Sequence, residues 1–167
     1  MLFSALIADP HAVVRRGTRD VIENLGGAVA AEAESGEKAL RLLEDRKPDL
    51  LVTEVALSPG SGLELLARVR AQSLPTRTLV LTDEDEGPYV SAAFRLGAQG
   101  YSLKSVPPGA VEAAVRAVLS GERYLTDRLP RSLIDPPAGD AAEALVAECR
   151  SEEAPRPPGA RARAATR

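Results

Sequence analysis

Four polar side chains directly follow apolar runs in this sequence, and their types could together bind a phosphate group. They are Asp9, Glu54, Thr82 and Lys104. If the four apolar runs are parallel strands, their carboxyl ends share one edge of the sheet, where such sheets place ligand sites. We therefore expect two carboxylates, a hydroxyl and an amine to form one pocket. In this pocket Glu54 and Lys104 can pair directly.

The apolar pattern alternates between strands and helices as far as about residue 121. Short apolar runs predict strands at residues 2–8, 28–33, 50–53, 78–81 and 100–103. Helical spacing predicts helices within residues 13–25, 35–47, 63–69, 88–97 and 108–120. Repeated strand-helix units imply an α/β fold, with a doubly wound parallel sheet and helices on both faces.

Composition and charge argue against several classes of protein. The 167 residues fit one domain with a modest extension. The net charge of -3 gives no general attraction to nucleic acid or to an anionic membrane. No apolar run approaches the roughly 20 residues needed to cross a bilayer, and the single cysteine, Cys149, cannot form an internal disulfide. We therefore expect a cytoplasmic protein without membrane contact.

Six segments, in this order, resemble the receiver domain of bacterial response regulators. They are LIAD at 6–9, PDLLV at 48–52, GLELL at 62–66, LVLT at 79–82, LGAQGYSLK at 96–104 and GERYL at 121–125. Each segment alone is a weak signal, but six in sequence are a strong one. The resemblance covers about residues 3–127, and it is to the subgroup that usually carries a C-terminal helix-turn-helix of the LuxR type.

This resemblance implies a flavodoxin-like (CheY-like) fold, with a five-stranded parallel sheet in the order 2-1-3-4-5 and five helices. It also implies a site that a partner histidine kinase normally phosphorylates on an aspartate after the third strand. By the same resemblance, Thr82 would contact the phosphoryl group and Lys104 would pair with it. Tyr101 would be the aromatic residue whose rotamer reports the active state.

The acidic positions of the family pattern are altered in this chain. Glu54 stands at the acceptor position, where its extra methylene moves the carboxylate by about 1.5 Å. A displacement near 1 Å can already cost about 100-fold in rate. By the same resemblance, two acids after the first strand, the acceptor carboxylate and the carbonyl of Ala56 would hold Mg²⁺. Here Asp9 is the first of these acids and Pro10 replaces the second, so Mg²⁺ at Asp9, Glu54 and the Ala56 carbonyl would bind weakly or not at all. We expect a pseudo-receiver with no firm cofactor and no enzymatic activity.

The leading prediction is an atypical stand-alone receiver in two-component-type signal transduction, independent of phosphorylation. It would act through protein contacts with a histidine kinase, another regulator or a second copy, on the face of its fourth and fifth helices or its first and fifth. A working phosphoacceptor and a truncated transcriptional regulator that forms mixed dimers are the alternatives. A flavin or nucleotide protein is disfavoured, because residues 9–13 lack glycines that would let backbone amides approach phosphate.

The composition changes after the predicted receiver domain, residues 1–125. Residues 126–150 are predicted to be a linker in which a short helix could span residues 140–149, and residues 151–167 a disordered tail rich in Pro, Ala and Arg. We expect no direct DNA binding, because no recognition helix follows residues 143–148 and no aromatic residue lies among the arginines of the tail. The only histidine, His11, is interpreted as structural.

Overall fold

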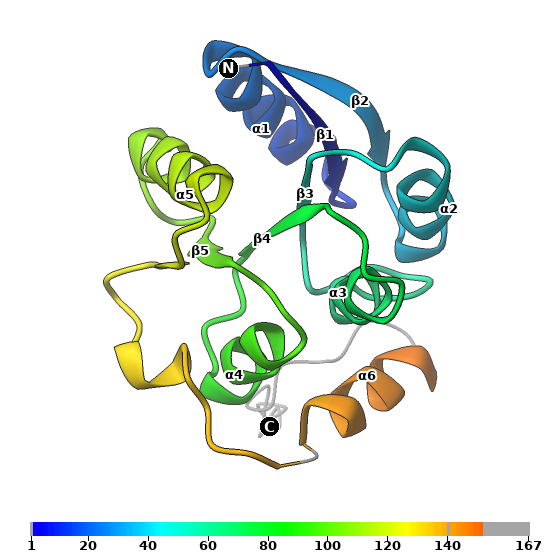
Figure 1. Cartoon of the computed structure of the whole chain (residues 1–167), viewed down its shortest axis with the longest axis vertical. Helices are drawn as coiled ribbons and strands as arrows, with labels where there is room; N and C mark the ends of the chain where they lie inside the picture. The colour runs from blue at the N-terminus through cyan, green and yellow to red at the C-terminus, as the bar shows by residue number, and fades with distance from the viewer. Residues whose placement is uncertain (1, 140, 152–167) are drawn as a thin grey trace, which may run out of the picture.

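A parallel sheet forms the centre of the computed structural model, which describes residues 2–139 and 141–151 (Figure 1). Neighbouring strands lie in the order β2-β1-β3-β4-β5-β6. Their bounds are β1 Phe3–Ala8, β2 Gly27–Ala33, β3 Leu50–Thr53, β4 Arg77–Thr82, β5 Gly100–Leu103 and β6 Tyr124–Leu125. The predicted order 2-1-3-4-5 is confirmed, and the two-residue strand β6 adds a sixth strand beside β5.

Helices connect the strands and cover both faces of the sheet (Figure 1). Their bounds are α1 Ala12–Asn24, α2 Gly36–Arg46, α3 Gly62–Ala71, α4 Gly87–Arg95, α5 Pro108–Ser120 and α6 Ala141–Ser151, with a short 3₁₀ helix, η1, at Arg131–Leu133. Helices α1 and α5 cover one face, where they form one apolar cluster with the sheet. Helices α2, α3 and α4 cover the other face.

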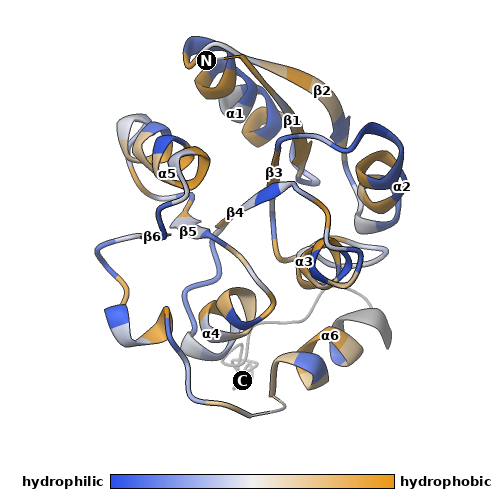
Figure 2. Cartoon of the chain, in the orientation of Figure 1, coloured by the Kyte–Doolittle hydropathy of each residue, from blue (hydrophilic) through white to orange (hydrophobic). Residues whose placement is uncertain are grey.

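Strand β1 shows why the apolar runs are continuous. Ala5 and Ile7 pack in the cluster beneath α1 and α5, whereas Leu6 and Ala8 pack with α2 on the opposite face. All four residues of β3 are buried as well. A parallel strand covered on both faces needs apolar residues at every position, so the pattern does not alternate. The helices turn their apolar residues towards the sheet (Figure 2).

A side-chain cap begins the helix that follows the β3 loop. The Ser61 hydroxyl accepts a hydrogen bond from the Glu64 amide at 3.1 Å, which satisfies one of the free N–H groups at the start of α3. The Gly62 amide donates to the Val55 carbonyl at 2.9 Å. A Cβ on Gly62 would collide with the Glu54 carbonyl oxygen. Ser61 and Gly62 therefore hold the start of α3 tightly against the residues that follow β3.

The segment after β6 packs onto the domain. Four of its apolar residues are buried in the cluster that includes α4: Leu129, Ile134, Ala142 and Val146. The short helix that we predicted at residues 140–149 is present as α6. The predicted disordered tail lies outside the described residues, apart from the last residue of α6. None of the helices in the described ranges is long and apolar enough to cross a membrane.

Candidate functional site

The four polar residues predicted to form one pocket do meet at the carboxyl edge of the sheet. Asp9, Glu54, Thr82 and Lys104 lie at the ends of β1, β3, β4 and β5. Backbone hydrogen bonds extend the strand pairing to these positions. The Glu54 amide donates to the Ala8 carbonyl at 2.8 Å, and the Lys104 amide donates to the Thr82 carbonyl at 2.9 Å. The sheet itself therefore fixes where each side chain begins.

Lys104 joins the two carboxylates. Its Nζ lies 2.6 Å from Asp9 Oδ2 and 2.6 Å from Glu54 Oε2. The side chains are 11%, 4% and 7% exposed for Lys104, Asp9 and Glu54 respectively, so water screens these pairs only weakly. Two carboxylates and one ammonium group leave a single net negative charge at the site.

The second carboxylate oxygen of Glu54 is also fully engaged. Oε1 accepts hydrogen bonds from the backbone amides of Val55, at 2.6 Å, and Ala56, at 3.2 Å. The hydroxyl of Thr82 donates to the same oxygen. Charge-assisted hydrogen bonds of this kind are shorter and stronger than neutral ones. Glu54 is therefore held by partners on both oxygens.

The charge state of Lys104 follows from these contacts. Burial alone would lower the pKa of its amine, but the hydrogen bonds to Asp9 and Glu54 and the charges of both carboxylates outweigh burial. Together they hold the pKa of Lys104 above its ordinary value. The amine is therefore a permanent cation at neutral pH, and it neutralises charge that a bound metal ion would otherwise have to balance.

Tyr101 lies inside the domain next to this site. Its ring is fully buried, and its hydroxyl donates to the Glu84 carbonyl at 2.7 Å. The Glu84 amide in turn donates to the Thr82 hydroxyl at 3.1 Å. Burial, followed by the charges of Glu84 and Glu54, raises the pKa of Tyr101, which keeps its phenol neutral. Glu84 thus connects Tyr101 to Thr82.

Asp9 is held by His11, which was interpreted above as structural, and by Arg15, which no sequence motif singled out. Its Oδ1 accepts from the His11 amide at 2.8 Å and lies 3.2 Å from the His11 ring nitrogen Nδ1. The Arg15 guanidinium donates to the Asp9 carbonyl at 2.8 Å. Pro10 is exposed and supplies no side-chain oxygen. No spacing rule points to Arg15, because its partner at the site is a backbone atom.

The donor set does not suit Mg²⁺. This ion prefers about six oxygen ligands in near-octahedral geometry. Here the facing oxygens of Asp9 and Glu54 hold an ammonium group, and Pro10 offers none. Among the described residues there is no group of three or more His, Cys, Asp or Glu side chains that could hold a metal. To hold a metal ion, Asp9 and Glu54 would first have to release the amine of Lys104.

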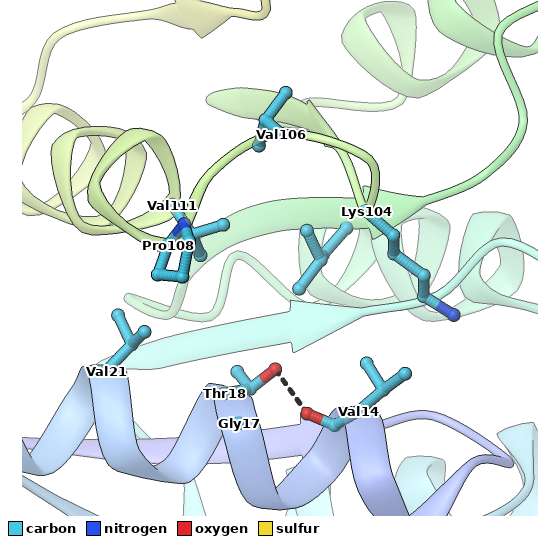
Figure 3. A pocket seen from close by; sticks show the side chains of 9 residues that line it. Val14, Gly17, Thr18, Val21, Lys104, Val106, Pro108 and Val111 are labelled. Carbon is cyan, nitrogen blue, oxygen red and sulfur yellow. Dashed lines mark hydrogen bonds between the residues drawn. The ribbon is translucent and has the colours of Figure 1, made fainter.

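An apolar hollow of about 210 Å³ lies beside the site, between α1 and α5 (Figure 3). Its lining includes Val14, Thr18, Val21, Val106, Pro108 and Val111. The stem of Lys104 borders one end, and its amine points away from the hollow (Figure 3). The Thr18 hydroxyl donates to the Val14 carbonyl at 2.9 Å. The charged groups of the site therefore lie on one side of Lys104, with Asp9 and Glu54, and the apolar hollow lies on the other.

A family model and curated relatives point to the same protein family. Residues 5–116 match the model of the response regulator receiver domain. The oxygen regulatory protein NreC of Staphylococcus haemolyticus is 36% identical over 134 residues, covering 78% of this chain and 61% of that protein. NreC of Staphylococcus aureus strain JH9 is 37% identical over 133 residues, with the same coverage of 78% and 61%. This chain therefore spans about three fifths of the length of these relatives.

Solved structures support the same fold. A LuxR-family two-component response regulator from Aurantimonas sp. SI85-9A1 superposes with a TM-score of 0.72 at 29% identity, covering 91% of this chain and 100% of the other. The signal receiver domain of a putative response regulator, NarL, from Mycobacterium tuberculosis superposes with a TM-score of 0.68 at 28% identity, covering 72% and 98%.

Proposed function

We propose that this chain, which belongs to the family of response regulator receiver domains, signals without aspartyl phosphorylation and acts through protein contacts. One observation carries the proposal. The carboxylate of Glu54 binds Lys104 through one oxygen and Thr82 through the other. By the family resemblance, these are the two side chains that would hold a transferred phosphoryl group. The Glu54 carboxylate therefore already binds the two side chains that a phosphoryl group would need.

A nucleophile in this arrangement is poorly placed for phosphoryl transfer. The reaction requires an attacking oxygen in line with the leaving oxygen, and cations that neutralise the charge on the transferred group. Both oxygens of Glu54 already accept strong hydrogen bonds, and Lys104 already balances two carboxylates. Transfer would have to break these contacts first, without a second acid at Pro10 to hold a metal.

The same contacts favour a single conformational state. Thr82 is drawn towards Glu54, and the Tyr101 ring is buried with its hydroxyl bonded to Glu84. By the resemblance, Tyr101 reports the active state of a receiver. We therefore propose that the Glu54 carboxylate holds the active state that a phosphoryl group holds in other receivers. A histidine kinase, another regulator or a second copy would then be bound as a protein partner in two-component signalling.

The test is a phosphorylation assay on the full chain. Acetyl phosphate and Mg²⁺ should leave the intact mass unchanged, because neither Glu54 nor the metal site is suited to the transfer. A stable increase of about 80 Da, the mass of one phosphoryl group, that disappears in Glu54→Ala would overturn the proposal. That result would instead favour the working phosphoacceptor, the main alternative. Circular dichroism of Glu54→Ala checks that the variant has folded.

A further inference from the structure

Helix α6 packs against α3 and α4 on the outer side of these two helices (Figure 1). Its apolar residues Ala142 and Val146 are 2% and 7% exposed, and Leu145 is half-buried against the same cluster. Ala142, Leu145 and Val146 have the spacing of one helical face. Figure 2 shows the apolar side of α6 turned towards α3 and α4. This face of the domain therefore accepts an amphipathic helix.

The chain just before α6 is firmly attached to the domain. Arg123 lies over the Phe94 ring at 5.3 Å, and it bonds Asp135 Oδ1 at 2.5 Å and the Ile134 carbonyl at 3.0 Å. The Arg95 guanidinium of α4 donates to the Pro137 carbonyl. These contacts fix the chain as far as Pro137. Helix α6 is thus tethered next to its own binding face by a short connection.

Surface hollows flank the contact between α6 and the domain. Two hollows of about 340 and 380 Å³ lie along it. The residues that both share are Arg70, Leu96 and Glu143. Both hollows are open to solvent, so α6 covers this face of the domain only in part. A helix whose only buried side chains among its described residues are Ala142 and Val146, with Leu145 half-buried, belongs to the parts of a protein that open before the rest.

We propose that the face formed by α3 and α4 is a docking groove for an acidic amphipathic helix of a partner protein, and that α6 is the internal helix that the partner displaces. The residues of α6 indicate which side chains a partner helix needs. A partner helix needs small apolar residues in place of Ala142 and Val146, and an acidic residue near Arg70, where α6 presents Glu143. Because this proposal rests on the packing of α6 alone, it holds whether or not Glu54 accepts phosphate.

Hydrogen exchange on the unmodified full chain tests whether α6 opens. The amides of α6 should exchange by local opening about 100-fold or more faster than those of β3, whose residues are all buried. Exchange rates for α6 within about tenfold of β3 would show that α6 is a permanent part of the core. That outcome would overturn the proposal without any substitution, and so without any risk of a misfolded variant.

A peptide-binding assay tests the groove. The probe is a fluorescent peptide with the sequence of Ala141–Ser151, and the host is the full chain carrying Val146→Asp, which should release α6. Because an internal occupant lowers apparent affinity by the fraction of open groove, this variant should bind the peptide at least about tenfold more tightly than the unmodified chain. The matched control is Ala144→Asp, which adds the same charge on the exposed side of α6 and should leave binding unchanged.

Three further outcomes, all from the binding assay or the oligomeric state, would overturn the proposal. The first is that a folded Val146→Asp chain does not bind the peptide. The second is equal binding by the Val146→Asp and Ala144→Asp chains. The third is a dimer of the unmodified chain that is lost in Val146→Asp, because the groove would then belong to α6 of a second copy. None of these readouts depends on phosphorylation, so failure here is distinct from failure of the proposed function.

Discussion

Lys104 Nζ lies equally close to Glu54 Oε2 and Asp9 Oδ2, at 2.6 Å from each. A cation between two buried carboxylates stabilises both and depends on both. Removing one member leaves partners that burial prevents from regaining water, and this penalty is usually larger than the net contribution of the intact pair. Stability measurements on single members therefore test the arrangement directly.

Glu54→Ala should destabilise the domain. The substitution leaves the amide of Val55 and the hydroxyl of Thr82 without their acceptor, and it removes one of the two partners of Lys104. We expect a loss of about 2–4 kcal/mol in the free energy of unfolding, measured by urea denaturation at neutral pH. The control is Glu37→Ala, since the Glu37 side chain is 61% exposed and pairs only at the surface with Arg41. A loss for Glu54→Ala no greater than that control would contradict the buried arrangement.

Restoring both missing acids should restore phosphorylation. In Glu54→Asp/Pro10→Asp the shortened side chain withdraws from Lys104 and Thr82, and the new carboxylate at exposed position 10 adds a metal ligand. Acetyl phosphate with Mg²⁺ should then add about 80 Da, one phosphoryl group, to the intact protein. Glu54→Asp alone is the matched control, and it should react more slowly because its ion site still lacks the second acid. A folded double variant that gains no mass would show that more than the two acids separates this chain from phosphorylated receivers.

The sequence predicted the position of the site better than its contacts. Asp9, Glu54, Thr82 and Lys104 could be found because each follows an apolar strand, and parallel strands bring their carboxyl ends together. The division of Glu54 between Lys104 and Thr82 depends on side-chain rotamers, which a strand pattern does not encode. The partner of Tyr101 is the carbonyl of Glu84, a backbone group that every residue carries.

The sequence pattern also failed to predict the packing of the C-terminal part of the described fold. Strand β6 has only two residues, Tyr124 and Leu125, too few for a recognisable period. The packed segment that follows is anchored by single apolar residues far apart in sequence, such as Leu129, Ile134 and Val146. Such spacing predicts a linker, because the burial of these residues comes from packing in the cluster of α3 and α4 and not from a local pattern.

Two glycine substitutions should change stability in opposite directions. A Cβ on Gly62 would collide with the Glu54 carbonyl, so Gly62→Ala should lose about 1–3 kcal/mol, as overpacking does. A Cβ on Gly17, inside α1, would meet open space, so Gly17→Ala should gain about 0.5–1 kcal/mol through the lower entropy of the unfolded chain. Thermal and urea unfolding of the two variants beside the unmodified chain measures both. Similar losses at both positions would contradict the close contact between α3 and the β3 loop.

Tyr101→Phe should be less sensitive to alkali than the unmodified chain. Burial, with the charges of Glu84 and Glu54, raises the folded-state pKa of Tyr101 above the value of 10.0 expected for an unfolded chain. The unfolded state therefore loses this proton first, so the stabilisation is complete below about pH 10 and falls by about 1.4 kcal/mol for each further pH unit.

Phenylalanine removes this alkaline loss, but it also removes the hydrogen bond to the Glu84 carbonyl, which should cost about 1 kcal/mol at neutral pH. The unfolding free energies of the two proteins should therefore converge between about pH 10 and 11. The raised pKa values of Lys104 and Tyr124 act in both proteins and cancel in the difference. Urea titrations at several pH values measure this difference, and parallel curves above pH 10 would mean that Tyr101 ionises in the folded domain and is not held inside it.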